Sequence, residues 1–270
     1  MTKYLATDLD GTLIFPKLKY SFVCKQNKDT IKLFKNNVII VSGRNQPFIK
    51  KVCKEIGVPQ TFVAANGASV YYNGKELFSY TLEKKNINKI IDYVQNNYKD
   101  YSIVIFDKNG KLFSLSDNVN STIETEAYYR KNYPKTSYTT NKNINTIKKL
   151  LSKENSIIKV NIDTNPINKE KIYNYLLSQN FNFSYAPSSH CLEITALEAN
   201  KGHSLLRLTE HMKINNNSVY VIGDDLNDVP MFELYKNSFL VSNDKNKSIH
   251  NKASHVLQKF TDLKEFIKEE

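Results

Sequence analysis

Two aspartates, Asp8 and Asp10, stand one residue apart after a short apolar run near the N-terminus, in the stretch LATDLDGTLI. In an extended chain the side chains of residues i and i+2 point to the same side, so these two carboxylates should face one small volume. Two like charges that close together raise the pKa of one carboxyl group unless a cation or a strong hydrogen-bond donor lies beside them. The pair therefore predicts a metal ion, a proton on one aspartate, or both.

Three further polar stretches occupy comparable places in the chain. Ser42-Gly43 comes directly after VIIV, Lys201 opens the helical pattern NKGHSLLRLTEHMKI, and GDDLND (residues 223–228) follows VYVI. Open α/β sheets bind ligands in the crevice where parallel strands meet their following loops. We therefore expect these residues to lie near Asp8. A lysine at the start of a helix opposes the helix dipole, which favours anions there, and this also indicates an anionic partner.

The elements around these residues alternate between strands and helices. Strands are expected within residues 3–7, 38–44 and 61–68, and helices over residues 28–37 and 45–57. The same alternation returns in the last third of the chain. This rhythm predicts an α/β fold with a parallel sheet and crossover helices, that is, a Rossmann-like core.

The middle of the chain has a different pattern. Hairpin signals at Asn73-Gly74 and Asn109-Gly110 alternate with helical segments, one of them over residues 122–130. This pattern predicts an α+β module whose sheet is mostly antiparallel. We assign residues 80–186 to this inserted domain and residues 1–79 and 187–270 to the core.

The composition is that of a folded protein, with 40% hydrophobic and 24% charged residues. The net charge of +11 is spread along the chain without an arginine-rich block, so we expect a small anionic substrate rather than a nucleic acid. The three cysteines lack C-x-x-C spacing, and the five histidines lack the spacing of a zinc site. No signal peptide or membrane-spanning run is recognisable. We expect a cytoplasmic monomer or weak homodimer without a membrane partner.

The four polar stretches, taken in order, resemble the four motifs of the haloacid dehalogenase (HAD) superfamily: DLDGTL, the serine after VIIV, the lysine of NKG, and GDDLND. The insert, together with AANGAS and LEITALEANKG, is similar to the Cof-type hydrolases of subclass IIB, which carry a large α/β cap in this place. The similarity covers nearly the whole chain. It implies a HAD core with an inserted cap that closes over the site and supplies substrate selectivity.

The resemblance implies a Mg²⁺-dependent phosphatase that acts on small phosphorylated metabolites, such as sugar phosphates, nucleotides or phosphorylated cofactors. Asp8 would be the nucleophile that forms an aspartyl phosphate. Asp10 would protonate the leaving alcohol and then, as a base, activate water.

The resemblance also implies two groups of binding residues. The phosphate group would be bound by Ser42, Gly43, Lys201 and Asn227. The Mg²⁺ ligands would be Asp8, the backbone carbonyl of Asp10, Asp224 and, directly or in an outer position, Asp228. The roles of two neighbours stay open: Asp225 occupies a variable position, and Arg44 either forms a local salt bridge or approaches the substrate.

Two other functions stay open. A phosphotransferase or sugar phosphomutase would pass the phosphoryl group to a sugar hydroxyl instead of water, and a catalytically silent protein would bind a metabolite without reaction. A calcium-binding EF-hand loop is excluded, because counting from Asp8 places Leu13 where glycine is required and Lys19 where the bidentate glutamate belongs.

Overall fold

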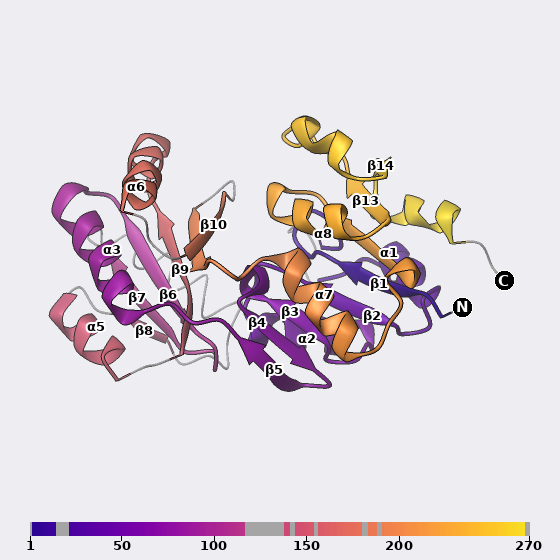
Figure 1. Cartoon of the computed structure of the whole chain (residues 1–270), viewed down its shortest axis with the longest axis horizontal. Coiled ribbons are helices and arrows are strands. Elements are labelled where there is room, and N and C mark those ends of the chain that lie inside the picture. The colour runs from indigo at the N-terminus through magenta and orange to yellow at the C-terminus, as the bar shows by residue number, and fades with distance from the viewer. Residues whose placement is uncertain are drawn as a thin grey trace. The chain divides into compact units, whose positions relative to one another are not determined.

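The computed structural model describes residues 2–14, 22–116, 138–140, 144–153, 156–179, 183–187 and 191–267. The chain forms two compact units, coloured by residue number in Figure 1. The core unit consists of Met1–Arg44, Ile49–Phe78 and Asn200–Glu270. The insert unit consists of Asn45–Phe48 and Ser79–Ala199.

An eight-stranded sheet forms the centre of the core unit, in the order β14-β13-β12-β1-β2-β3-β4-β5. The strands from β14 to β3 run parallel, and β4 runs antiparallel to β3. The carboxyl ends of the parallel strands therefore meet at one edge of the sheet. The strands are β1 (Tyr4–Thr7), β2 (Val38–Val41), β3 (Phe62–Ala64), β4 (Ser69–Tyr72), β5 (Lys75–Ser79), β12 (Val219–Gly223), β13 (Asn237–Val241) and β14 (His255–Leu257).

Helices and short 3₁₀ segments accompany this sheet. Leu205 and Leu208 of α7 pack with Met231 and Phe232 of α8 and with buried side chains of the strands. Every residue of β2 is buried, as expected of a strand that is covered on both faces. The helices are α1 (Lys25–Lys32), α2 (Gln46–Ile56), α7 (Lys201–His211) and α8 (Val229–Leu234), and the 3₁₀ segments are η1 (Ala65–Gly67), η2 (Asn216–Ser218), η3 (Leu226–Asp228), η4 (Lys247–Lys252) and η5 (Phe260–Phe266).

The first helix differs from its expected position. It was expected over residues 28–37, but α1 begins at Lys25 and ends at Lys32. Lys35 and Asn36 have φ angles of 50° and 68°, in the left-handed region that does not continue a right-handed helix. The chain therefore leaves the helix before the end of the periodic pattern.

A six-stranded sheet forms the insert unit, in the order β10-β11-β9-β6-β7-β8. Neighbouring strands pair antiparallel, except for β7 and β8. The expected helix over residues 122–130 lies outside the described residues. The elements are α3 (Lys84–Asn97), β6 (Ser102–Asp107), β7 (Leu112–Ser116), β8 (Tyr138–Thr140), α5 (Ile144–Leu151), β9 (Ile157–Asp163), α6 (Pro166–Ser178), β10 (Phe183–Pro187) and β11 (Leu192–Ala196).

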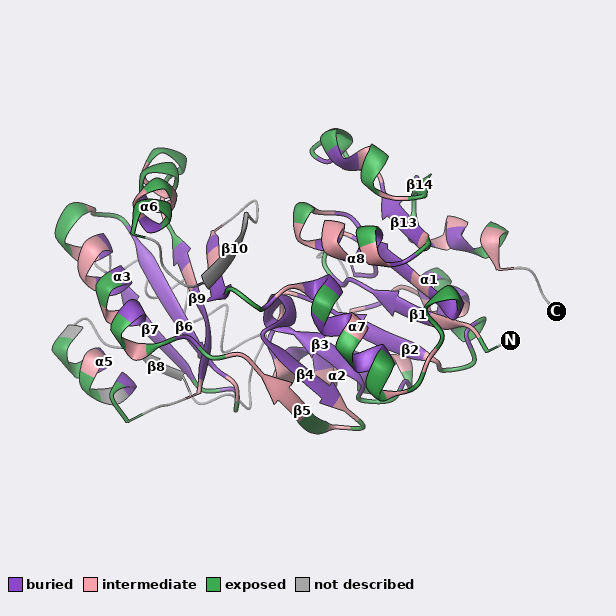
Figure 2. Ribbon diagram, viewed as in Figure 1, coloured by how far each residue is buried: buried purple, intermediate pink, exposed green. Residues whose placement is uncertain are grey.

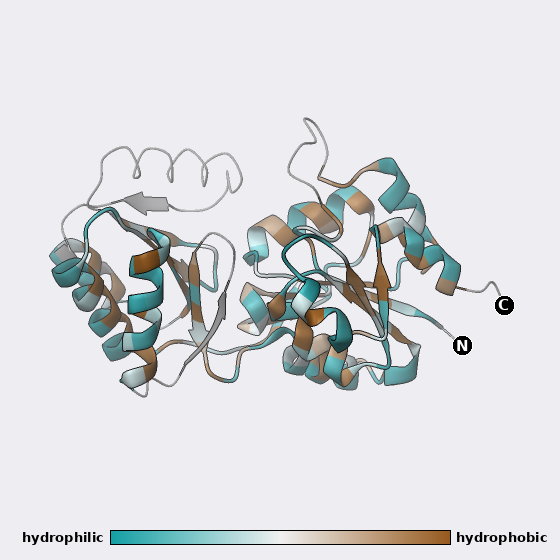
Figure 3. Ribbon diagram, turned by 90° about the horizontal axis from the view of Figure 1, so that it is seen from above, coloured by the Kyte–Doolittle hydropathy of each residue, from teal (hydrophilic) through white to brown (hydrophobic). Residues whose placement is uncertain are grey.

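The core of the insert unit lies between its sheet and its helices. Ile90 of α3, Ile147 of α5 and Ile172 of α6 are buried against strand side chains such as Ile105 and Val160. Figure 2 shows the buried residues along these strands, and Figure 3 shows hydrophobic residues concentrated in the strands of both units. The expected α/β class, with a mostly parallel sheet and a second, mostly antiparallel one, is confirmed. In the described part of the chain, no helix combines the length and apolar character needed to cross a bilayer.

Helices α7 and α8 approach each other closely at Gly202. A Cβ atom at this position would lie 2.3 Å from the backbone oxygen of Pro230. Such a separation is far below van der Waals contact, so a larger residue would force the two helices apart. Lys201 is the first residue of α7, and η3, which contains Asn227 and Asp228, directly precedes α8. The contact at Gly202 therefore also fixes the spacing between Lys201 and η3.

We predict that Gly202→Ala lowers the free energy of unfolding by about 1–3 kcal/mol, the usual cost of overpacking. The direction is opposite to helix propensity, which favours alanine over glycine. Urea unfolding measures the change. Glu210→Ala, at an exposed position of the same helix, is the control and should stay within about 0.5 kcal/mol of the wild type. A Gly202→Ala variant as stable as the wild type would contradict the close contact.

Candidate active site

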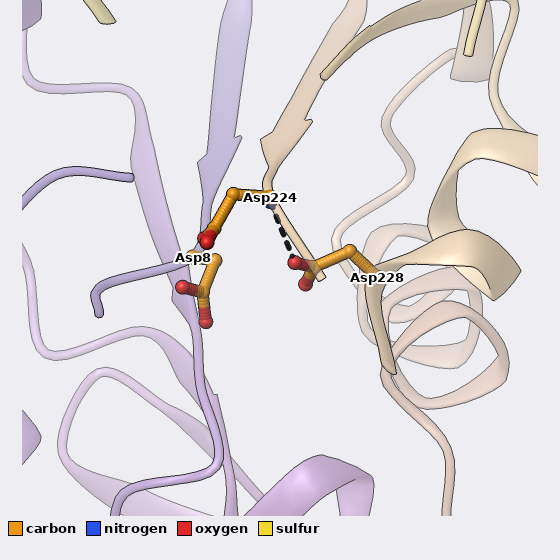
Figure 4. Close-up of side chains that lie close together, drawn as sticks. All are labelled: Asp8, Asp224 and Asp228. Atoms are coloured by element: carbon orange, nitrogen blue, oxygen red, sulfur yellow. Dashed lines mark hydrogen bonds between the residues drawn. The ribbon is translucent and has the colours of Figure 1, made fainter. Parts of the chain in front are cut away.

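Three buried or nearly buried carboxylates meet at the carboxyl edge of the core sheet. Asp8 follows β1, Asp224 follows β12, and Asp228 ends η3. The Asp8 N–H donates to the carbonyl oxygen of Ile222 at 2.9 Å, which joins the ends of β1 and β12. One ligand oxygen from each of the three aspartates lies within 4.8 Å of the others, as Figure 4 illustrates. Asp8 is more than 200 positions from the other two aspartates in sequence, and the parallel sheet brings them together.

Lys201 supplies the positive charge of this cluster. Its Nζ atom lies 2.7 Å from Asp8 Oδ1, 2.7 Å from Asp228 Oδ1 and 3.2 Å from Asn227 Oδ1. An ammonium group has three N–H donors, so these three acceptors match its capacity. Both Lys201 and Asp228 are fully buried, at 1% and 0% exposure, and the ion pairs are therefore shielded from water.

Asp228 holds the turn after β12 in place. Its second oxygen, Oδ2, accepts hydrogen bonds from the backbone N–H groups of Asp224 (2.9 Å) and Asp225 (3.1 Å), the first of which is the dashed line in Figure 4. A Cβ atom at Gly223 would lie 2.3 Å from the carboxyl carbon of Asp228, so only glycine allows this approach. Both oxygens of Asp228 thus have protein partners.

Asp224 is fixed by the loop that follows β1. The Thr12 hydroxyl donates to Asp224 Oδ1 at 2.7 Å, and the Asn246 side chain donates to the backbone oxygen of Asp224 at 2.8 Å. Gly11 has a φ angle of +86°, and a Cβ atom there would lie 2.3 Å from Asp224 Oδ2. The glycine after the two N-terminal aspartates is therefore required both for the turn and for the approach of Asp224.

Burial and mutual repulsion determine the charge state of the cluster. Burial raises the pKa of Asp8 well above its usual range, against the lowering effect of Lys201, and the charges of Asp228 and Asp224 raise it further. Burial and the charge of Asp228 raise the pKa of Asp224 to about 7. Burial by itself would lower the pKa of Lys201, but Asp228 and Asp8 raise it above its usual value, so the lysine stays charged. Three carboxylates around one ammonium leave an excess of negative charge that favours a bound cation.

Asp10 lies outside the carboxylate cluster. Its side chain is 49% exposed and forms a bidentate ion pair with Arg44, with Nε–Oδ2 and Nη2–Oδ1 distances of 2.8 Å and 2.7 Å. Strand β1 already ends at Thr7, but the charge of Asp10 still raises the pKa of Asp8, so the two carboxylates interact. For Arg44, whose role was open, the structure shows the local salt bridge.

The predicted phosphate-binding residues lie on three segments of the core unit. Ser42 is buried directly after β2, where its N–H donates to the Val63 oxygen of β3 at 2.9 Å, and Gly43 follows it. Lys201 opens α7, and Asn227 of η3 lies beside its ammonium group. The strand order β12-β1-β2 places the Asp8 loop between the loops of Asn227 and Ser42.

Three further polar residues support these groups, although the sequence motifs predicted no role for them. Thr12 and Asn246 hold Asp224, and Asn66 accepts a hydrogen bond from Asn227 at 3.2 Å. Thr12 could have been found from its place in DLDGTL. Asn66 could likewise have been found from its place in AANGAS, whereas Asn246 carries no comparable signal, because the chain contains many asparagines.

Comparison with known proteins decides the family. The profile described as haloacid dehalogenase-like hydrolase matches residues 5–263. The chain belongs to this family. The predicted HAD membership is therefore confirmed.

Relatives of this HAD-like hydrolase include a Mycoplasma capricolum protein of uncharacterised function, 29% identical over 98% of this chain and 100% of that protein. The 5-amino-6-(5-phospho-D-ribitylamino)uracil phosphatase YwtE of Bacillus subtilis is 28% identical over 86% of this chain and 85% of its own. A solved structure described as a HAD subclass IIB sugar phosphatase has a TM-score of 0.79 at 13% identity, covering 99% of this chain and 100% of that one. The family and these phosphatase names confirm the expected enzyme class, a phosphoric monoester hydrolase.

We predict that Lys201→Met destabilises the protein more at alkaline than at acidic pH. Removing one partner of a buried ion pair typically costs about 3–5 kcal/mol. Burial raises the pKa of Asp8 in the folded state above its value in the unfolded chain. Between these two pKa values of Asp8, the folded variant binds more protons than the unfolded chain. Its stability should therefore fall as the pH rises through that range.

Urea unfolding in the presence of EDTA, at about pH 5 and about pH 8, measures this difference. Lys252→Met is the matched control: its pair with Glu233 is exposed, so the change should stay below about 1 kcal/mol. A Lys201→Met variant with wild-type stability at the higher pH would contradict the role of the lysine in the cluster.

Proposed function

We propose that this chain is a Mg²⁺-dependent phosphatase that hydrolyses small phosphorylated metabolites through an aspartyl phosphate on Asp8. The observation that carries the proposal is the contact of Asp8 with the charged, buried Lys201. A carboxylate and a phosphate repel each other, and a fixed cation beside both reduces that repulsion where charge develops in the transition state. The phosphatase names of the relatives support the same reaction.

The reaction has two halves, both carried by residues of the core unit. In the first, a carboxylate oxygen of Asp8 attacks phosphorus, the bond from phosphorus to the ester oxygen breaks, and Asp10 gives its proton to that oxygen. In the second, Asp10 takes a proton from water while the water oxygen attacks phosphorus. The bond between phosphorus and Asp8 breaks, and inorganic phosphate leaves.

The Arg44–Asp10 ion pair bears on the order of these steps. Each oxygen of Asp10 accepts a hydrogen bond from one nitrogen of the Arg44 guanidinium, a geometry that suits a carboxylate. In this arrangement Asp10 can act as a base, whereas acting as an acid requires the pair to open and the carboxyl to gain a proton. Arg44 thus positions the Asp10 side chain through two hydrogen bonds.

The donor set around Asp8 fits Mg²⁺, which prefers oxygen ligands and keeps several waters. Asp8 and Asp224 would hold the ion together with the backbone carbonyl of Asp10. Both oxygens of Asp228 already accept hydrogen bonds, from Lys201 and from two backbone amides, which favours its outer position. When bound, the ion would neutralise charge between nucleophile and phosphate.

We predict that Asp8→Asn abolishes phosphate release from p-nitrophenyl phosphate in Mg²⁺, with a fall of at least about a thousandfold, because a carboxamide cannot replace the nucleophile. Colorimetric detection of nitrophenol and free phosphate measures it. Asp29→Asn is the matched control, because the Asp29 side chain is 42% exposed and forms its ion pair with Lys32 of the same helix, α1. Full activity in the Asp8→Asn enzyme would refute the assignment of Asp8 as the nucleophile. For the wild type, phosphate release from a panel of phosphorylated metabolites ranks the substrates.

We predict that Mg²⁺ raises the melting temperature of the wild type, since a ligand at a hundred times its Kd adds about 2.7 kcal/mol of stability. Protons compete with the ion because burial raises the pKa of Asp8 and of Asp224, the latter to about 7. The shift should therefore be larger above that pH than below it. Differential scanning fluorimetry measures the Mg²⁺-dependent shift in melting temperature. Asp224→Asn should lose this shift, and Asp29→Asn should retain it. A melting-temperature shift that persists in Asp224→Asn would contradict the assignment of Asp224 as a Mg²⁺ ligand.

A further inference from the structure

Asn66 occupies an unusual backbone position beside the candidate active site. It lies in η1, the turn after β3, with φ and ψ angles of 57° and 31°, and it is 4% exposed. A left-handed conformation is uncommon outside glycine, although asparagine tolerates it better than most residues. Such conformations persist where surrounding contacts determine them, and they occur often at functional sites.

The turn is held by two segments that carry predicted phosphate-binding residues. The Asn66 N–H donates to the Ser42 oxygen at 3.1 Å, and the Ser204 hydroxyl of α7 donates to the Gly67 oxygen at 2.8 Å. At Gly67, φ is +99° and a Cβ atom would lie 2.3 Å from the backbone oxygen of Asn200, so the turn lies directly against the start of α7. These contacts fix the backbone of Asn66 relative to the start of α7, where Lys201 stands.

The hydrogen-bond donors and acceptors around Asn66 leave only one arrangement of the neighbouring amides. Lys201 can only donate, so the atom of Asn227 that faces its ammonium group at 3.2 Å is the oxygen. The amide nitrogen of Asn227 then faces Asn66, at 3.2 Å, and Asn66 must present its own oxygen. A permanently charged lysine at one end of the chain of contacts thus fixes the orientation of both amides.

We propose that Asn66 is a positioning residue for phosphoryl transfer: it holds the Asn227 amide so that one N–H donates to Asn66 and the second donates to the phosphate group. A carboxamide nitrogen carries two N–H groups, which permits both contacts. Without the Asn66 oxygen, the Lys201 contact still holds the Asn227 oxygen, but the amide N–H groups lose the acceptor that directs one of them towards Asn66 and the other towards the phosphate. This proposal rests on the proposed function, because it needs a phosphate beside Asn227.

A second Asn-Gly turn of the core unit provides a matched control. Asn73 also has a left-handed φ angle, 49°, followed by Gly74 at 79°. Its side-chain oxygen accepts from the Thr61 hydroxyl at 3.5 Å, and the pair joins the loops before β3 and after β4. Loss of the Asn73 side chain therefore tests the cost of changing such a turn without touching Asn227.

The experiment compares Asn66→Gly with Asn73→Gly in steady-state hydrolysis of p-nitrophenyl phosphate. Glycine adopts left-handed angles without strain, so both variants should fold, and thermal unfolding checks this. Asn66→Gly should lower kcat by about tenfold or more, somewhat less than the loss of an entire oxyanion donor. Asn73→Gly should keep the wild-type kcat. Asn66→Asp retains an acceptor oxygen and the preference for the turn, and it should keep a higher kcat than Asn66→Gly.

A double-mutant cycle separates positioning from a general structural role. If Asn66 acts through Asn227, adding Asn66→Gly to Asn227→Ala should leave kcat unchanged, because the amide to be positioned is already absent. Additive losses, or equal kcat in Asn66→Gly and Asn73→Gly, would overturn the positioning role while the wild type still shows Asp8-dependent phosphate release. A wild type without Asp8-dependent release would overturn the proposed function and this inference together.

Discussion

The buried ammonium group of Lys201 is the interaction on which the candidate site depends. It joins Asp8, which follows β1, to Asp228 and Asn227 of η3, and each of its N–H groups has an acceptor. Burying carboxylates without a cation would cost several kcal/mol each, so the lysine makes this arrangement of acidic groups possible. Because burial still raises the pKa of Asp8, the cluster keeps a demand for further positive charge. The negative charge of the buried carboxylates therefore explains both the need for Lys201 in the folded structure and the proposed binding of a metal ion.

Close backbone approaches give this cluster its geometry. Gly11 lets Asp224 reach the loop after β1, Gly223 admits the carboxyl group of Asp228, and Gly202 lets α7 contact the chain at Pro230. In each case a Cβ atom would lie 2.3 Å from its neighbour, well inside van der Waals contact. A side chain at Gly11 or Gly223 would displace the carboxyl group of Asp224 or Asp228, and one at Gly202 would displace the backbone at Pro230. The small residues around the motifs are as necessary to the site as its charges.

Much of the fold and the acidic motifs could be predicted from sequence, because both follow from local patterns. The run VIIV predicts a strand buried on both faces, and β2 is such a strand. Prediction failed where contacts overrule local pattern: α1 ends at Lys32, although the periodicity continues, because Lys35 and Asn36 turn left-handed. Asp10 pairs with Arg44, a contact that the sequence left open, and its charge still raises the pKa of Asp8.

The sequence by itself determined the family, the α/β class and the residue types able to transfer a phosphoryl group, since these depend on motifs a few residues long and on strand and helix periodicity. Only the tertiary structure decided which side chains form hydrogen bonds and ion pairs with one another. The three acceptors of Lys201, the partner of Arg44 and the orientation of Asn227 by Asn66 all join residues far apart in the chain. Such contacts depend on where the strands end and on which donors remain after folding, and no local pattern records that.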